Sequence, residues 1–179
     1  MAQQIKGFKR GDLAKKFAEE KFFMGAEIGV ADGRFSEYMC KHIPNLKLLC
    51  VDPWAPYKGN NRYLGYSRRD HRPNEELARE RMATYGAMMF KGFSMDALKE
   101  VGDDVLDFVY IDANHDFDYV MEDIVGWGRK VKKGGIISGH DYYAFNHSGV
   151  KEAVDAYAYF HKFEVFTTDE NEPSWFFYK

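Results

Sequence analysis

The residues best suited to chemistry stand directly after two apolar segments of the chain. Asp112 and then His115 follow the apolar run Val105–Ile111. His140 and Asp141 follow the next short apolar segment. Carboxylates are hard oxygen ligands that suit Mg²⁺ or Mn²⁺, and histidine is the side chain that titrates near neutral pH without perturbation. This pattern predicts a site that binds a divalent cation or a hydroxyl group of a substrate. One of its side chains would take the proton of that hydroxyl group.

Structural roles compete with these functions at some positions. His115 could equally cap the helix that follows it, and Asp116 fits a helix N-cap better than a metal ligand. His140 would suit Mn²⁺ or a similar ion and suits Mg²⁺ poorly. Asp112 and Asp141 are the stronger candidates, because each ends an apolar strand where the fold alone does not require an acid.

A glycine-rich turn and a following acid are typical of a site for a nucleoside-containing cofactor. The segment EIGVADGRFS contains Glu27, Gly29 and Gly33. Asp52 comes 25 residues after Glu27, at the end of the next apolar run. Glycines let the backbone approach a ligand closely, and a carboxylate at a strand end can accept both hydroxyls of a ribose. The spacing differs from GxGxxG, so the dinucleotide fingerprint is not met.

The elements that must position these residues alternate between strands and helices. Strands are predicted at Phe22–Ile28, Leu46–Val51, Ala87–Lys91, Val105–Ile111, Ile136–Ser138, Phe163–Thr168 and Ser174–Tyr178. Helices are predicted at Gly33–His42, Asn74–Tyr85, Met95–Val101, 117–131 and 150–161, and the fourth of these is ended by the cations and glycines of Lys132–Gly135. Residues 53–73 are rich in Pro, Gly and Asn and are typical of a long loop insertion.

This alternation predicts an α/β fold in one domain that spans residues 1–179. We expect a Rossmann-like, doubly wound sheet of seven strands, mostly parallel with an antiparallel last strand. Ligands of such sheets bind at the carboxyl ends of the strands, where the strand order reverses. Asp52, Asp112 and Asp141 all fall at such ends. The paired charges within residues 15–20 indicate the exposed face of a further helix.

Several of these segments together resemble the class I S-adenosylmethionine-dependent methyltransferases, from Met24 onward. EIGVADGRFS resembles the first motif of that superfamily, and LLCVDPW resembles the second. IDANHDFDYVMEDI and GGIISGHDYY are similar to small-molecule O-methyltransferases related to antibiotic-tailoring sugar methyltransferases and, more distantly, to catechol O-methyltransferase. The resemblance implies methyl transfer from S-adenosylmethionine to a hydroxyl of a small-molecule acceptor that is anionic or sugar-like.

The resemblance also assigns roles to individual residues. Glu27, Gly29 and Gly33 would shape the methionine and ribose region, Asp52 would bind the ribose hydroxyls, and Ser94 and Met95 in GFSMDAL would flank the adenine. Asp112, His140 and Asp141 would hold Mg²⁺ or Mn²⁺, although His140 stands where that group more often has another acid. His115 or His140, with Asp112, would carry the catalytic proton transfer. Six loop aromatics are candidates to stack on adenine or the acceptor: Trp54, Tyr57, Tyr63, Tyr66, Tyr142 and Tyr143.

Composition and charge narrow the classes of function. The 179 residues carry 25 Lys or Arg and 28 Asp or Glu, a net charge of −3, which is not the footprint of a protein that coats nucleic acid or anionic membrane. Residues 58–81 are locally basic and could form a lip over an anionic substrate or only a solvated face. Cys40 and Cys50 form no disulfide framework, and neither a secretory signal nor a membrane span is recognisable, so we expect a cytoplasmic protein.

Other functions stay open at this point. The basic stretch at residues 58–81 suggests a nucleic-acid methyltransferase as the first alternative. The negative net charge and the absence of an Asn/Asp-Pro-Pro-Tyr/Phe tetrapeptide argue against it. A non-catalytic module that binds S-adenosylmethionine is the second alternative, and a nicotinamide-dependent dehydrogenase is a third. The sequence leaves open whether the chain forms a homo-oligomer.

Overall fold

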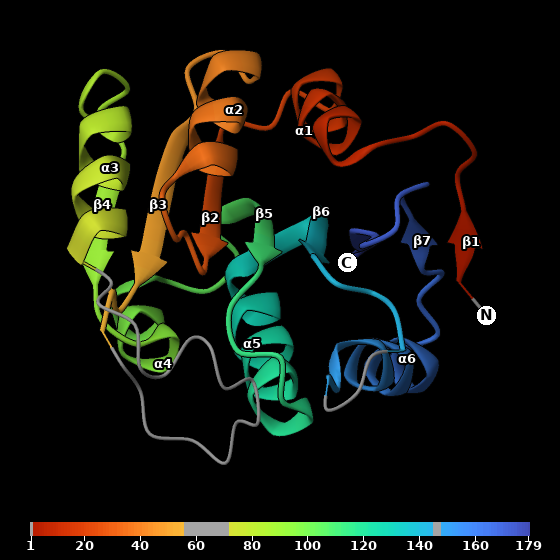
Figure 1. Ribbon diagram of the computed structural model, residues 1–179. Helices are drawn as coiled ribbons and strands as arrows, with labels where there is room; N and C mark the ends of the chain where they lie inside the picture. Colours follow the sequence, from red (N-terminus) through yellow and green to blue (C-terminus); the bar gives the residue numbers. More distant parts are fainter. Residues whose placement is uncertain (1, 56–71, 145–147) are drawn as a thin grey trace.

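Eight strands form one sheet in the computed structural model, which describes residues 2–55, 72–144 and 148–179. The strands are β1 (Gln3–Gln4), β2 (Met24–Ile28), β3 (Lys47–Asp52), β4 (Met88–Lys91), β5 (Leu106–Ile111), β6 (Val131–Gly139), β7 (Phe166–Thr167) and β8 (Trp175–Tyr178). Their spatial order is β1-β7-β8-β6-β5-β2-β3-β4 (Figure 1). The chain therefore runs outward in one direction through β2, β3 and β4, then returns to place β5 and β6 on the other side of β2.

The directions of the strands confirm the predicted fold class. Neighbouring strands from β4 to β6 pair in parallel, whereas β8 runs antiparallel to both β6 and β7. The strand beyond the expected seven is β1, which pairs in parallel with β7. Its two glutamines are exposed, so no apolar pattern in the sequence could indicate it.

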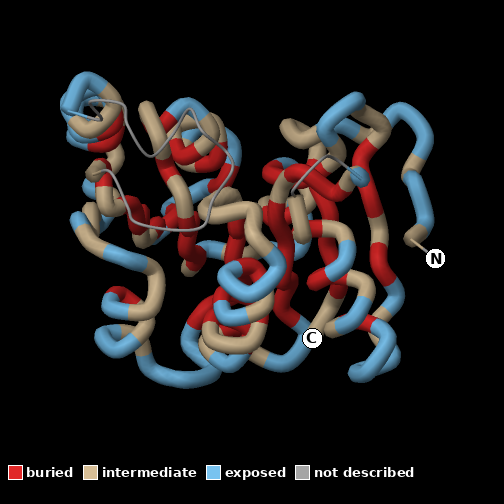
Figure 2. Tube along the Cα trace, turned by 60° about the horizontal axis from the view of Figure 1, so that its bottom comes forward, coloured by how far each residue is buried: buried red, intermediate tan, exposed pale blue. Residues whose placement is uncertain are grey.

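Helices cover both faces of this sheet (Figure 1). They are α1 (Arg10–Glu19), α2 (Arg34–His42), α3 (Arg72–Ala83), α4 (Ser94–Ala97), the 3-10 turn η1 (Leu98–Glu100), α5 (Phe117–Lys130) and α6 (Val150–His161). One apolar core cluster packs α1, α2 and α3 against the sheet, and a second packs α5 and α6 against the opposite face. Figure 2 shows the buried segments gathered between these two outer layers. No helix in the described residues has the length and apolar character that a bilayer crossing requires.

The predicted helix 117–131 ends within one residue of α5, but the role predicted for Lys132–Gly135 is wrong. Lys132–Gly135 lie inside β6 instead of closing the helix, because α5 ends at Lys130 and the extended, fully buried Val131 pairs with Leu106 of β5. Gly134 has a φ of 81°, and the pairing register between β5 and β6 shifts near this point. These glycines therefore serve an irregular strand, where a left-handed residue must fit.

Other predicted boundaries also shift. Helix α3 begins at Arg72, two residues before the predicted start at Asn74, and the predicted strand Phe163–Thr168 is reduced to the two residues of β7. The predicted insertion at 53–73 falls mostly on residues 56–71, which lie outside the described residues. Asp116 does stand at the N-cap position of α5, but its side chain makes no cap hydrogen bond.

Candidate active site

A cavity of about 1140 Å³ opens at the carboxyl ends of the central strands β2, β3 and β5. Strand order reverses at this place, which is where ligands of doubly wound sheets bind. Seven of the residues singled out from the sequence line it: Glu27, Gly29, Asp52, Ser94, Met95, Asp112 and His115. Gly33, His140 and Asp141 are not among its lining residues.

The glycine-rich turn is held closely against the neighbouring strand. Gly29 has a φ of 87°, and a Cβ atom there would lie 1.9 Å from the carbonyl oxygen of Asp112. Only glycine fits such a conformation at such a contact. Gly33 has a φ of 79° at the N-cap of α2, where a Cβ atom would lie 3.0 Å from Ala78 of α3. Gly29 thus shapes the cavity directly, and Gly33 positions α2.

Asp52 ties this turn to the end of β3. Its Oδ2 accepts hydrogen bonds from the backbone N–H groups of Val30 (2.9 Å) and Ala31 (3.0 Å). Its Oδ1 accepts one from the backbone N–H of Trp54 (2.7 Å). A carboxylate has about four lone-pair sites, so these three bonds leave capacity for a ligand hydroxyl. Its predicted contact with the ribose therefore stays a prediction, and the structure adds a bracing role.

Two buried acids lie at the floor and wall of the cavity. Glu27 is 1% exposed and accepts a hydrogen bond from the Ser36 hydroxyl; burial raises its pKa to about 8. Asp123 of α5 accepts a hydrogen bond from Ser94, whose hydroxyl in turn accepts one from Trp127 Nε1 at 2.8 Å. Burial raises the pKa of Asp123 to about 7. Sequence reasoning missed Asp123, although an acid on the apolar face of a helix was a usable signal.

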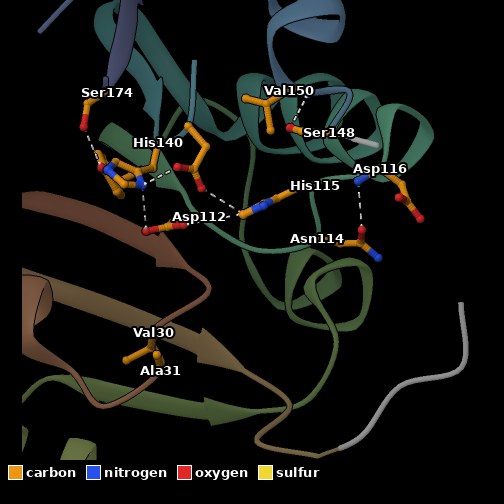
Figure 3. Close-up of polar contacts among 12 residues, drawn as sticks. Val30, Ala31, Asp112, Asn114, His115, Asp116, His140, Ser148, Val150 and Ser174 are labelled. Carbon is orange, nitrogen blue, oxygen red and sulfur yellow. Dashed lines mark hydrogen bonds and ion pairs between the residues drawn. The ribbon is translucent and has the colours of Figure 1, made fainter. Parts of the chain in front are cut away.

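The four acids and histidines predicted at the ends of β5 and β6 come together (Figure 3). His115 Nε2 lies 3.2 Å from Asp141 Oδ2 and 3.8 Å from Asp112 Oδ1. His140 Nδ1 lies 3.2 Å from Asp141 Oδ1 and 3.8 Å from Asp112 Oδ2. Ligand atoms of Asp112, His115 and Asp141 all lie within 4.8 Å of one another. Among the described residues, these three form a group that could hold one metal ion. His115 is the histidine of this group, whereas the sequence predicted His140 as the ligand.

Charges within this cluster perturb its members. Burial disfavours ionisation of Asp112, but the hydrogen bond from His115 and the positive charge of Arg10 outweigh it and lower the pKa of Asp112 to about 2. Burial likewise disfavours protonation of His115, but Asp112 and Asp141 outweigh it and raise the pKa of His115 above 6.5. Asp141 itself adopts a left-handed backbone conformation, with a φ of 59°. Non-glycine residues in that region are strained and concentrate at functional sites.

Arg10, the first residue of α1, also reaches this cluster and was missed from the sequence. Its Nη2 donates a hydrogen bond to Asp112 Oδ2 at 3.0 Å. Its guanidinium carbon stands 4.1 Å from the ring centroid of Phe35 and 4.9 Å from that of Tyr110. Arg10 and Asp112 are 102 positions apart in the chain, so no local pattern links them.

Among the described residues, two of the loop aromatics and two arginines of the basic stretch contact other parts of the chain. Trp54 is 4% exposed and donates its indole N–H to the carbonyl oxygen of Ala31, and the Tyr142 hydroxyl donates to Asp155; neither lines the cavity. Tyr57, Tyr63 and Tyr66 lie outside the described residues. In the basic stretch, Arg79 pairs with Glu75 and Arg81 with Asp32.

A mostly parallel sheet with an antiparallel last strand, and a cavity at the switch point between β2 and β5, define the class I S-adenosylmethionine-dependent methyltransferase fold. The chain belongs to the methyltransferase domain family, whose model matches residues 26–142. A search of curated proteins finds no match.

Solved structures share this fold over nearly the whole chain. The O-methyltransferase from Bacillus cereus, in complex with SAH, is 12% identical with a TM-score of 0.69, covering 95% of this chain and 80% of that one. The O-methyltransferase TomG from Streptomyces achromogenes, involved in tomaymycin synthesis and in complex with SAM, is 14% identical with a TM-score of 0.68, covering 95% and 79%. A putative rRNA-methylase from Clostridium thermocellum is 11% identical with a TM-score of 0.67, covering 98% and 99%. At these identities the likeness concerns the fold.

Proposed function

We propose that this protein transfers the methyl group of S-adenosylmethionine to a hydroxyl group of a small molecule. The observation that carries the proposal is that one cavity contains both the glycine-rich turn with Asp52 and the pair formed by Asp112 and His115. Methyl transfer is an in-line displacement, which a protein accelerates by aligning the two reactants and by removing the proton of the acceptor. This cavity has residues for both tasks.

In this proposal the cofactor lies along the cavity from the end of β4 to the end of β5. Ser94 and Met95 flank the adenine, and Asp52 accepts a ribose hydroxyl with its remaining lone pair. The bare backbone at Gly29 leaves room for the methionyl chain. Glu27 forms the floor beneath that chain.

The acceptor hydroxyl lies against Asp112 and His115 and gives up its proton there. His115 lines the cavity, so it is the proton acceptor that a substrate can reach. His140 is not among the lining residues and contacts Asp141 through Nδ1. Asp112 and Asp141 stabilise the histidinium that forms, because both carboxylates lie within 4 Å of His115 Nε2.

The same cluster fits a divalent cation, because two carboxylates and one imidazole are a donor set suited to Mn²⁺ and similar ions. Asp112, His115 and Asp141 would hold it, and its chemical contribution would be a lower pKa of an acceptor hydroxyl. In that arrangement His115 is a ligand of the cation and is not the group that takes the proton.

Calorimetric titration with S-adenosylmethionine and S-adenosylhomocysteine, each with and without Mn²⁺, tests the proposal. The wild-type protein should bind both, and a screen of small hydroxyl compounds, including anionic and sugar-like ones, should then reveal a methyl acceptor. An absence of cofactor binding under all four conditions would falsify the proposal. Cofactor binding with unchanged background transfer in an Asp112→Ala variant would instead indicate a non-catalytic binding module.

Manganese binding separates the two roles of His115. Electron paramagnetic resonance should show Mn²⁺ binding that is weakened in Asp112→Asn and retained in Asp116→Asn, a nearby acid outside the cluster. If His115→Gln also loses Mn²⁺, His115 is a ligand. If it keeps Mn²⁺ and loses turnover, His115 is the base.

A nucleic-acid acceptor has less support. Arg79 and Arg81 of the basic stretch are engaged with acids of the chain itself, and the net charge is −3. Salt-dependent binding of RNA by the purified protein would overturn this preference.

A further inference from the structure

Arg10 is a partly buried cation that the proposed mechanism does not use. It lines the cavity, and 27% of its side chain is exposed. Its one hydrogen-bonded acid there is Asp112, at 3.0 Å. Among the described lining residues the other arginine is Arg34, whose side chain is 80% exposed and pairs with Asp32. Arg10 is thus the arginine that presents its charge inside the cavity.

Contacts from the far end of the chain fix the position of Arg10. Its backbone N–H donates to Glu170 Oε2 at 2.8 Å. Asp169, in the same turn before β8, accepts a hydrogen bond from the backbone N–H of Gly7 at 2.9 Å and one from the Lys9 side chain. The start of α1 is therefore clamped to this acidic turn, and the clamp directs Arg10 toward the cavity.

The Arg10 guanidinium is held in one orientation, but one of its hydrogen-bond donors has no partner among the described residues. Phe35 and Tyr110 stack against it, and this stacking restricts its orientation. Its buried Nε has no hydrogen-bond partner among the described residues. Buried donors without partners are rare in folded proteins, and each one calls for an explanation such as a ligand. An arginine fork is suited to bind a carboxylate through two parallel hydrogen bonds.

We propose that Arg10 binds the methionyl carboxylate of the cofactor and that Asp112 holds the Arg10 guanidinium when no cofactor is bound. This inference rests on the proposed function, which places the adenosine part at Ser94 and Asp52. The amino-acid part then extends past Gly29 toward Arg10. When the cofactor carboxylate shares the guanidinium, Asp112 loses part of its counter-ion and becomes available to a cation or an acceptor hydroxyl.

The proposal implies that the two ends of the cavity are coupled. Arg10 and a divalent cation compete for Asp112, and a cofactor carboxylate relieves that competition. Binding of the cofactor and of Mn²⁺ should therefore strengthen each other by the same factor. A cofactor analogue without the carboxylate should not show this coupling.

Calorimetric titrations with S-adenosylhomocysteine and with its decarboxylated analogue, S-adenosyl-3-thiopropylamine, test the assignment. The wild-type protein should prefer S-adenosylhomocysteine by roughly tenfold to a hundredfold, the range for a charge-assisted hydrogen-bonded pair. Arg10→Gln should bind both ligands about equally, and Arg10→Lys should keep part of the preference. Arg34→Gln is the matched control and should keep all of it, because Arg34 is exposed and engaged with Asp32.

The outcomes separate this assignment from the proposed function. A wild-type protein that binds neither ligand refutes both. A wild-type protein that binds the two ligands equally, or an Arg10→Gln variant that keeps the preference, refutes only the role of Arg10. Thermal unfolding followed by circular dichroism shows whether Arg10→Gln is folded. If it is not, the preference of Arg10→Lys for S-adenosylhomocysteine over the decarboxylated analogue decides. A preference as large as that of wild type would count against a carboxylate contact made by two parallel hydrogen bonds from Arg10.

Discussion

Replacing Asp123 by Asn should change how the stability of the protein depends on pH. Asp123 is 4% exposed, and burial raises its pKa from 3.8 to about 7. Since the unfolded chain keeps the ordinary pKa, the acid contributes fully to stability below about pH 3.8, and this contribution is lost as the pH rises through 7. A rise of about three pH units corresponds to about 4 kcal/mol at ~1.4 kcal/mol per unit.

Asn keeps the shape of the side chain and an oxygen that can accept the hydrogen bond from Ser94, but it has no charge to bury. Relative to wild type, the Asp123→Asn variant should therefore gain free energy of unfolding between about pH 5 and pH 7, at about 1.4 kcal/mol per pH unit. Above about pH 7 the difference should stay constant.

Urea unfolding followed by tryptophan fluorescence at four pH values measures this difference. Asp118→Asn, on the exposed first turn of the same helix, is the matched control and should follow wild type at every pH. If the stabilities of Asp123→Asn and wild type run parallel from about pH 5 to pH 8, Asp123 is not a buried carboxyl group with a raised pKa.

Two further perturbations test the cofactor end of the cavity. Gly86 is the control for Gly29, because it has a φ of 65° and open space where a Cβ would stand. Gly86→Ala should therefore lower the free energy of unfolding only by the strain of the left-handed backbone conformation, about 1–2 kcal/mol. Gly29→Ala should cost clearly more because its Cβ would meet the Asp112 carbonyl, and equal melting temperatures for the two variants would contradict the close approach. Asp52→Ala leaves three backbone N–H groups without their acceptor. The variant should therefore lose about 2 kcal/mol or more of its free energy of unfolding, and it should also lose cofactor binding. A thermal melt that matches wild type would contradict the bracing role of Asp52, and a calorimetric titration that matches wild type would contradict its role in binding the cofactor.

The central strands and the turn after β2 could be predicted because their signals are local. Buried parallel strands such as β3 and β5 appear as continuous apolar runs, and an acid at the end of such a run is visible without any knowledge of its neighbours. Gly29 was recognisable because it stands in a glycine-rich turn directly after its strand, although the contact that requires glycine is made with the distant Asp112. The predicted meeting of Asp112, His115, His140 and Asp141 followed from topology, because parallel strands bring their carboxyl ends to one edge of the sheet.

The start of β6 at Val131 could not be predicted, because one sequence pattern fits two different structures. Lysines followed by glycines stop a helix when the chain leaves it for solvent, and they also fit an irregular strand when the chain enters a sheet. Pairing between Val131 and Leu106 decides between them, and that contact joins residues on two different elements. A similar limit applies to β1, whose exposed glutamines form a strand only because β7 offers an open edge.

Arg10 shows most clearly what a linear pattern cannot contain. Its place depends on an acidic turn about 160 positions away, and its partner Asp112 comes directly after β5, a central strand of the sheet. The same turn, read locally, is only a polar connection between β7 and β8. Because the antiparallel β8 inserts between β6 and β7, the turn before it is carried to the rim of the cavity, where it meets the start of α1. The strand reversal thereby also fixes the position of Arg10 beside Asp112, so a change at Glu170 should act on Asp112 through Arg10.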